Sequence, residues 1–97
     1  MEITVQELKA KMDNKENFLL IDVREKHEYD EFNIGGKLIP LGDIMTAIAD
    51  LEEHKGEEII IHCRSGKRSF MAQQLMIQAG YSNVKNLTGG VLAWQEM

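Results

Sequence analysis

The residues of this chain best suited to covalent chemistry lie around its only cysteine. Cys63 follows the apolar segment 59–61, which consists of three isoleucines, and precedes a short segment with three basic side chains. Residues 70–79 then carry apolar side chains at helical spacing, with Gly80 as a stop signal. The pattern predicts that Cys63 lies where a buried strand ends and a helix is about to begin.

This position favours an anionic sulfur on Cys63. The first amides of a helix have no partner within the helix, and the helix dipole adds positive potential at the same end. Arg64, Lys67 and Arg68 add three cations, and Gly66 permits a backbone conformation in which successive N–H groups turn inward. We therefore expect a Cys63 thiol with a pKa below that of a free cysteine, able to attack an anionic substrate. Arg68 could bind that substrate or brace the loop through a carboxylate.

The other polar residues near the cysteine have competing interpretations. Asp22 ends a second apolar run, and an aspartate there needs an arginine or a loop N–H as its partner, so a structural role is favoured. Arg24 could add to the positive field around the substrate. Ser65 and Ser69 could donate hydrogen bonds to the sulfur, although capping of the helix is the commoner role for serine. His62 is expected to point to the opposite face of the sheet, because side chains alternate along a strand.

Strand and helix signals alternate along the rest of the chain. Strands are expected at Ile3, 18–23, 38–39, 59–61 and 84–87, and helices after Thr4, over 25–32 (as a helix or turn), from Asp43 to 55, over 70–79 and after Thr88. Thr4 and Glu7 form a capping-box pattern, and Asp43 and Thr88 are expected to cap their helices. The alternation predicts an α/β fold with a mainly parallel sheet, in which ligands bind beyond the carboxyl ends of the strands.

Length and composition limit the possible functions. The chain has 97 residues, 43% of them hydrophobic, which predicts a single domain over residues 1–97. Its net charge of −5 disfavours general binding to nucleic acid, yet three of its eleven basic residues follow Cys63, which favours a small anionic ligand. One cysteine excludes an internal disulfide, and scattered histidines predict no metal or cofactor. No apolar run is long enough to span a membrane and no secretion signal is present, so we expect a cytoplasmic protein without membrane partners.

The pattern Cys63-Arg64-x-Gly66-x-Arg68-Ser69 resembles the active-site loop of the rhodanese family of sulfurtransferases. Further segments that resemble this family are Asp22-Val23-Arg24 with Glu28-Tyr29, Ile34-Gly35-Gly36 with Ile39-Pro40, and Leu87-Thr88-Gly89-Gly90 with Trp94. They occur in the family's order and span the chain from about Phe18 to Trp94. The resemblance implies a rhodanese-like three-layer α/β/α domain whose central, mainly parallel sheet has about five strands.

The resemblance also implies a thiosulfate:cyanide-type sulfurtransferase. Cys63 would take a sulfane sulfur from a small anionic donor as a persulfide and pass it to a thiol or cyanide. A sulfur-relay protein is a further candidate partner. The residues expected to bind the substrate are Arg64, Ser65, Gly66, Lys67, Arg68 and Ser69. Asp22 and Arg24 are expected to support the site.

Three other functions stay open, namely a cysteine-dependent phosphatase, an arsenate reductase and a non-enzymatic sulfur-carrier or binding module. Four residues separate Cys63 from Arg68, one fewer than in protein tyrosine phosphatases, and the rhodanese-related cell-cycle phosphatases also have a longer loop. An arsenate reductase would need external thiols, because the chain has no second cysteine. Inactive relatives of the family usually lose the cysteine, and this chain keeps it. The loop length therefore favours sulfur transfer.

Overall fold

A computed structural model of the protein describes residues 1–97. The elements in chain order are β1 (Glu2–Ile3), α1 (Val5–Asp13), β2 (Leu19–Asp22), α2 (Lys26–Glu31), β3 (Lys37–Leu38), the short 3₁₀ helix η1 (Leu41–Asp43), α3 (Ile44–Asp50), the 3₁₀ helix η2 (Glu52–His54), β4 (Ile59–His62), α4 (Lys67–Gln78), β5 (Val84–Leu87) and α5 (Gly90–Gln95). Each expected strand is present, and segment 25–32, left open as a helix or turn, contains the helix α2. The other expected helices are present too, but the helix expected from Asp43 to 55 ends at Asp50 and is followed by the separate 3₁₀ helix η2.

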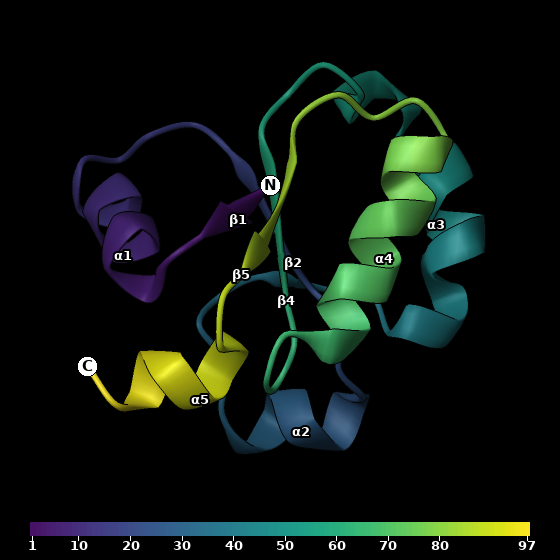
Figure 1. Ribbon diagram of the computed structural model, residues 1–97. Helices are drawn as coiled ribbons and strands as arrows, with labels where there is room; N and C mark the ends of the chain where they lie inside the picture. Colours follow the sequence, from purple (N-terminus) through teal and green to yellow (C-terminus); the bar gives the residue numbers. More distant parts are fainter.

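The five strands form one sheet in the order β1-β5-β4-β2-β3, and every neighbouring pair is parallel. Helices α1 and α5 lie on one side of the sheet, α3 and α4 lie on the other, and α2 lies at the carboxyl edge of the strands (Figure 1). The expected α/β/α architecture with a five-stranded parallel sheet is therefore confirmed. Strand β4 lies at the centre, so the loop that follows it is surrounded by other elements.

The isoleucines of β4 divide the core into two parts. Ile59 and Ile61 belong to the larger cluster, which includes Met76 of α4, whereas Ile60 belongs to the cluster on the other face, with Leu8 of α1. Side chains alternate between the two faces of a strand, so consecutive isoleucines enter opposite cores. This double burial explains the uninterrupted apolar run before Cys63 and gives the loop a rigid base.

Of the three caps that the sequence predicts, one is confirmed. Thr4 and Glu7 form the capping box, with the Glu7 N–H donating to Thr4 Oγ1 over 3.1 Å and the Thr4 N–H donating to Glu7 Oε1 over 2.9 Å. Asp43 lies at the start of α3 but makes no capping hydrogen bond, because η1 runs directly into that helix. The prediction for Thr88 is wrong, since α5 begins after Gly89 and the Thr88 hydroxyl donates to Glu2 of β1 instead.

None of the helices combines the length and the apolar character that crossing a membrane would require.

Candidate active site

Cys63 is the first residue after β4, and α4 begins four residues later. Gly66 lies between them with a φ angle of +107°, a left-handed conformation that glycine adopts without steric cost. This turn closes the segment on itself and directs its amides toward the cysteine side chain. Cys63 is 1% exposed, so its sulfur is recessed beneath the loop. The strand–loop–helix arrangement expected from the sequence is present.

Hydrogen-bond donors surround the sulfur. The Gly66 N–H donates to Cys63 Sγ over 3.1 Å, and the Ser69 hydroxyl lies 3.4 Å from the same atom. Burial raises the pKa of the Cys63 thiol, but hydrogen bonds from the Ser69 hydroxyl and from the amides of Ser69, Gly66 and Ser65 outweigh it, and the net pKa is lowered. Ser69 therefore contacts the sulfur and does not cap α4, whose first residues have no side-chain cap. The surroundings favour a nucleophilic thiolate.

The first turn of α5 holds the loop from behind. The Val91 N–H donates to the carbonyl oxygen of Cys63 over 3.0 Å, and the Leu92 N–H donates to that of Arg64 over 3.1 Å. Gly90 permits this close approach, because a Cβ at this position would lie 2.6 Å from the Arg64 carbonyl oxygen. Its φ of +56° also favours glycine. With their carbonyls held by α5, the loop peptides are fixed with their N–H groups available to the sulfur.

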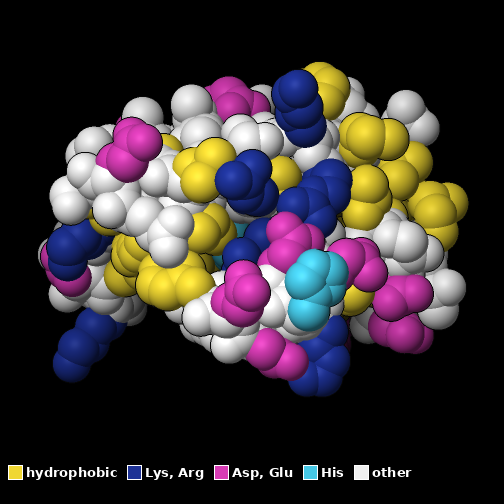
Figure 2. All heavy atoms as spheres, turned by 90° about the horizontal axis from the view of Figure 1, so that it is seen from below, with side chains coloured by type: hydrophobic (Ala, Val, Ile, Leu, Met, Phe, Trp, Pro, Cys, Tyr) yellow, Lys and Arg dark blue, Asp and Glu magenta, His cyan; other side chains and the backbone are white.

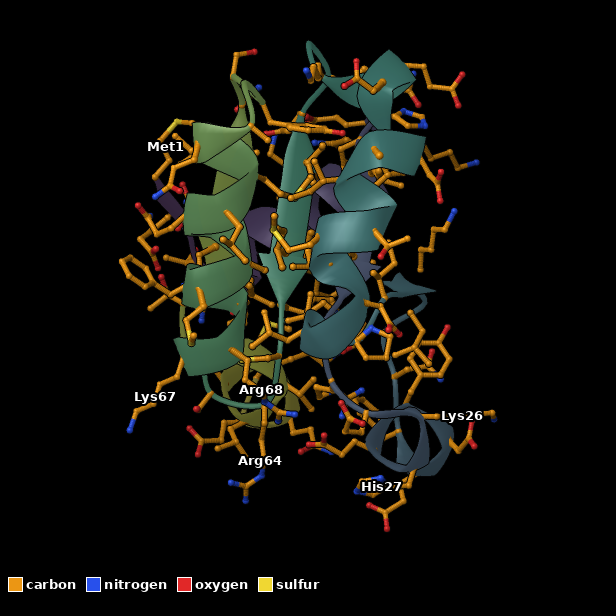
Figure 3. The ribbon with its side chains drawn as sticks, turned by 90° about the vertical axis from the view of Figure 1, so that its right-hand side faces the viewer. Met1, Lys26, His27, Arg64, Lys67 and Arg68 are labelled. Atoms are coloured by element: carbon orange, nitrogen blue, oxygen red, sulfur yellow. The ribbon has the colours of Figure 1, made fainter.

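The three cations of the loop have different environments. Arg68 donates to both carboxylate oxygens of Glu28 on α2, over 2.7 and 2.9 Å, so it braces the loop against α2. These hydrogen bonds lower the pKa of Glu28 to about 2. Arg64 and Lys67 are exposed and have no acidic partner. Figure 3 shows both extending away from the loop, whereas Arg68 lies closer to the body of the protein.

Arg64 and Lys67 line different grooves. Lys67 borders an open groove of about 650 Å³ that also includes Gly66 and the exposed apolar side chains of Phe70 and Met71. Arg64 borders a smaller groove of about 240 Å³ between α2 and α5. Seen from the carboxyl edge of the sheet, basic side chains gather near the middle of the face, next to acidic side chains (Figure 2). Both grooves border the loop, and the smaller one also contains the carboxylates of Glu28 and Glu31.

Asp22 and Arg24 form a buried pair beneath α2 and are not among the hydrogen-bond donors around Cys63 Sγ. Arg24 donates through Nε and Nη2 to the Asp22 carboxylate over 2.8 to 3.1 Å, which gives Asp22 the arginine partner that its position required. Arg24 also donates to the carbonyls of Glu28 and Phe32 and is 4% exposed. Arg24 therefore has a bracing role, with its charge paired to Asp22, and it also lines the smaller groove beside Arg64. A contribution of Arg24 to the field around the substrate stays a prediction.

His62 lies against the Asp22–Arg24 pair. Its Nε2 atom is 3.7 Å from Asp22 Oδ2, and neither ring nitrogen has a hydrogen-bond partner. Burial lowers the pKa of His62, which favours the neutral ring. The neighbouring Cys63 packs instead with the core cluster of Ile61, as alternation along the strand predicts.

One buried residue of β5 contacts the loop but has no role among the predictions from the sequence. Asn86 donates through Nδ2 to the Gly66 carbonyl over 3.1 Å and accepts from the Ser69 hydroxyl over 2.5 Å. A polar side chain between Val84 and Leu87, near the carboxyl end of an expected strand, was the available signal. The role of Glu28 as the partner of Arg68 was also missed, because nothing near either residue in the sequence links them.

Comparisons with known proteins agree with this fold. Residues 4–97 match the family model described as "Rhodanese-like domain". The chain is 38% identical over 94 residues to the putative sulfur carrier protein YrkF of Bacillus subtilis, covering 96% of this chain but only 50% of that relative. It is 34% identical over 94 residues to a sulfurtransferase of Allochromatium vinosum, covering 96% of this chain and 86% of the relative. A crystal structure of a rhodanese-like domain protein from Staphylococcus aureus has a TM-score of 0.83 and 32% identity, over 97% of this chain and 91% of that one.

Proposed function

The chain belongs to the rhodanese-like domain family, and on this basis we propose that it is a thiosulfate-type sulfurtransferase carrying sulfur as a persulfide on Cys63. The observation that carries the proposal is the environment of the sulfur. The only thiol of the chain lies within reach of the amide of Gly66 and the hydroxyl of Ser69, at the start of α4. These donors match a sulfur atom that becomes anionic during the reaction.

The proposed reaction has two steps. The Cys63 thiolate attacks the outer sulfur of thiosulfate, a sulfur–sulfur bond forms, and the original bond breaks as sulfite leaves with its electron pair. An acceptor thiolate, or cyanide in an assay, then attacks the terminal sulfur of the persulfide and releases the Cys63 thiolate. Sulfur is transferred without any net change in the enzyme. The amides of the loop stabilise the anionic sulfur in each state of the cycle.

Arg64 and Lys67 are the proposed attractants for the donor, because they are the exposed cations of the loop without an acidic partner. Arg68 contributes mainly by fixing the loop through Glu28. A relative described as a putative sulfur carrier supports a protein thiol as a second acceptor class, in a sulfur-relay step. We also propose that residues 1–97 act as a single domain in the reducing cytoplasm, where a free thiol persists.

The pairing of Arg68 favours sulfur transfer over phosphate hydrolysis. A phosphatase needs amides and an arginine arranged around three peripheral oxygens, and it needs a general acid for the leaving oxygen. The Arg68 guanidinium is occupied by Glu28, and the Asp22 carboxylate is occupied by Arg24. This arrangement therefore orients Arg68 toward Glu28 and makes Asp22 unsuited to act as the general acid.

Intact-mass analysis tests the proposal. Thiosulfate should add one sulfur atom to the protein, cyanide should remove it, and the Cys63→Ser variant should gain none. On the same preparation, hydrolysis of an aryl phosphate should be negligible while thiosulfate turnover is easily measured. Equal persulfide loading in Cys63→Ser, or Cys63-dependent phosphatase turnover comparable to sulfur transfer, would reject the assignment.

A further inference from the structure

Asn86, the third residue of β5, lies behind the sulfur loop and is 4% exposed. Its backbone is fixed on both sides, because β5 lies between β1 and β4, where Asn86 is in register with Glu2 and Ile61. Its N–H donates to the carbonyl oxygen of Met1 over 3.1 Å. The side chain of Asn86 therefore projects from a rigid part of the sheet.

The contacts of the Asn86 side chain determine its orientation. The Gly66 carbonyl oxygen lies 3.1 Å from the amide nitrogen of Asn86 and can only accept a hydrogen bond. The NH₂ group must face Gly66, so the Oδ1 atom must face Ser69, whose hydroxyl oxygen lies at 2.5 Å. Asn86 thus presents an acceptor, and no donor, to Ser69.

The Ser69 hydroxyl has one proton and two possible acceptors. Asn86 Oδ1 lies at 2.5 Å and Cys63 Sγ lies at 3.4 Å. When the proton points to Asn86, the lone pairs of Ser69 face the sulfur, which suits a protonated thiol that is itself a donor. When the proton points to the sulfur, it stabilises a thiolate or persulfide and leaves Asn86 Oδ1 without a partner.

We propose that Asn86 is a positioning residue that competes with the Cys63 sulfur for the single Ser69 proton, and so sets how strongly Ser69 stabilises an anionic sulfur. Asn86 does not touch the sulfur and acts through Ser69. The inference deepens the proposed function and rests on it for its purpose, because the sulfur alternates between more and less anionic states during transfer. The proton turns toward the sulfur when negative charge forms there and returns to Asn86 when that charge is lost.

Other charged groups near the sulfur remain the same in the experiment below. Arg68 of α4 is paired with Glu28 of α2. His62 lies beside the buried ion pair between Arg24 and Asp22 at the end of β2. Since none of these residues is changed, their influence on the titration of Cys63 cancels between variants.

The test measures the effect of Ser69→Ala on the pKa of Cys63 in three backgrounds, namely native Asn86, Asn86→Leu and Asn86→Asp. The ultraviolet absorbance of the thiolate is followed against pH, with Cys63→Ser as the blank, so that the only cysteine supplies the signal. Ser69→Ala should raise the pKa by about one pH unit in Asn86→Leu, where the proton is free to face the sulfur. The rise should be smaller with native Asn86 and smallest in Asn86→Asp, whose carboxylate holds the proton more strongly.

Each comparison is made between two proteins with the same residue at position 86. The effects of the lost contact to Gly66 and of the charge added in Asn86→Asp on the pKa of Cys63 are therefore present in both proteins and cancel. Equal effects of Ser69→Ala in the three backgrounds would overturn the proposal, because a purely structural Asn86 would not change what Ser69 contributes. If circular dichroism shows that Asn86→Leu does not fold, the comparison of native Asn86 with Asn86→Asp still decides. The proposal is rejected if Ser69→Ala raises the pKa of Cys63 as much in Asn86→Asp as it does with native Asn86. The titration uses no sulfur donor, so its outcome is independent of persulfide loading.

Discussion

The reactivity of Cys63 depends on a balance between burial and hydrogen bonding. A buried thiol is ordinarily harder to ionise, because the charged form loses its hydration. Here the amides of the loop and the Ser69 hydroxyl replace that hydration, and the pKa of the thiol is lowered. A recessed thiolate held by fixed donors has little need of a general base, which agrees with His62 being neutral and packed away from it.

The two unpaired cations of the loop should act on donor capture. Lys67→Ala and Arg64→Ala are each expected to raise the KM for thiosulfate about two- to fivefold with little change in kcat, because exposed charges contribute modestly to binding. Added salt should weaken donor binding more in the wild type than in the variants. Steady-state kinetics at two ionic strengths measures both effects. The variant with the larger effect identifies the groove by which the donor approaches.

Lys15→Ala is the matched control. Lys15 is exposed, has no acidic partner and lies in the turn before β2, at the opposite edge of the sheet from Cys63. Its removal changes the net charge by the same amount as Lys67→Ala. If Lys15→Ala raises KM as much as the loop variants do, the effect comes from overall charge and the loop cations have no special role.

At the scale of the elements, α5 holds the loop in place. A six-residue helix at the end of the chain supplies two backbone donors to the carbonyls of Cys63 and Arg64. The approach is possible only because Gly90 has no side chain. Gly90 thus has a physical explanation in the packing of α5 against the loop after Cys63.

Gly90→Ala should disturb the loop as well as the fold. The added Cβ would meet the carbonyls of Cys63 and Arg64, and the left-handed backbone disfavours alanine, so we expect a loss of about 2 kcal/mol in the free energy of unfolding. The pKa of Cys63 should rise, because α5 and the loop amides must shift. Denaturant unfolding and thiolate absorbance measure the two effects.

Gly56→Ala is the control for this substitution, because a Cβ at Gly56 would meet nothing within 4 Å. It should leave the pKa of Cys63 unchanged. The role assigned to α5 would be wrong if Gly90→Ala destabilised the protein and left both the pKa of Cys63 and the rate of sulfur transfer at their native values.

Across the whole molecule, ion pairs join elements that are distant in the sequence. Glu28 of α2 pairs with Arg68 of α4, and Glu58 before β4 pairs with Lys11 of α1 and Lys85 of β5. Hydrogen bonds from Arg68 lower the pKa of Glu28 from 4.5 to about 2. Burial opposes the shift at Glu58, but hydrogen bonds from Lys85 and Lys11 lower its pKa too. The folded state is therefore expected to weaken in acid.

Glu28→Gln tests the pH dependence of this stabilisation. Because the folded-state pKa of Glu28 is depressed, its contribution is fully present above about pH 4.5 and is lost as the pH falls toward 2. The Tm of Glu28→Gln should lie below that of the wild type at neutral pH, and the difference should shrink in this acid range. Thermal unfolding monitored by circular dichroism measures it.

Glu31→Gln serves as its control, because Glu31 is an exposed residue of the same helix without a basic partner. It should change Tm little at any pH. A Tm difference between Glu28→Gln and the wild type that stayed constant from neutral pH down to about 2 would show that the Glu28 carboxylate is not what stabilises the contact between α2 and α4.

The sequence by itself determined the properties that depend on neighbouring residues. The run of isoleucines and the periodicity of segment 70–79 set a buried strand before Cys63 and a helix after it, because burial and helical spacing are local patterns. The capping box at Thr4 is equally local, since its partners are three residues apart. The sequence also predicted amides directed at the Cys63 sulfur, because the start of a helix exposes its own N–H groups wherever it occurs.

Only the tertiary structure decided which polar groups meet across the chain. Arg64, Lys67 and Arg68 are alike in sequence, yet only Arg68 meets a carboxylate, on a residue 40 positions away. Ser69 and Asn86 are 17 positions apart and become partners because the parallel sheet places β5 beside β4. A hydrogen bond requires its two atoms to lie within about 3 Å in a suitable direction. The packing of whole helices and strands sets that condition, and the residues on either side of each partner in the sequence do not.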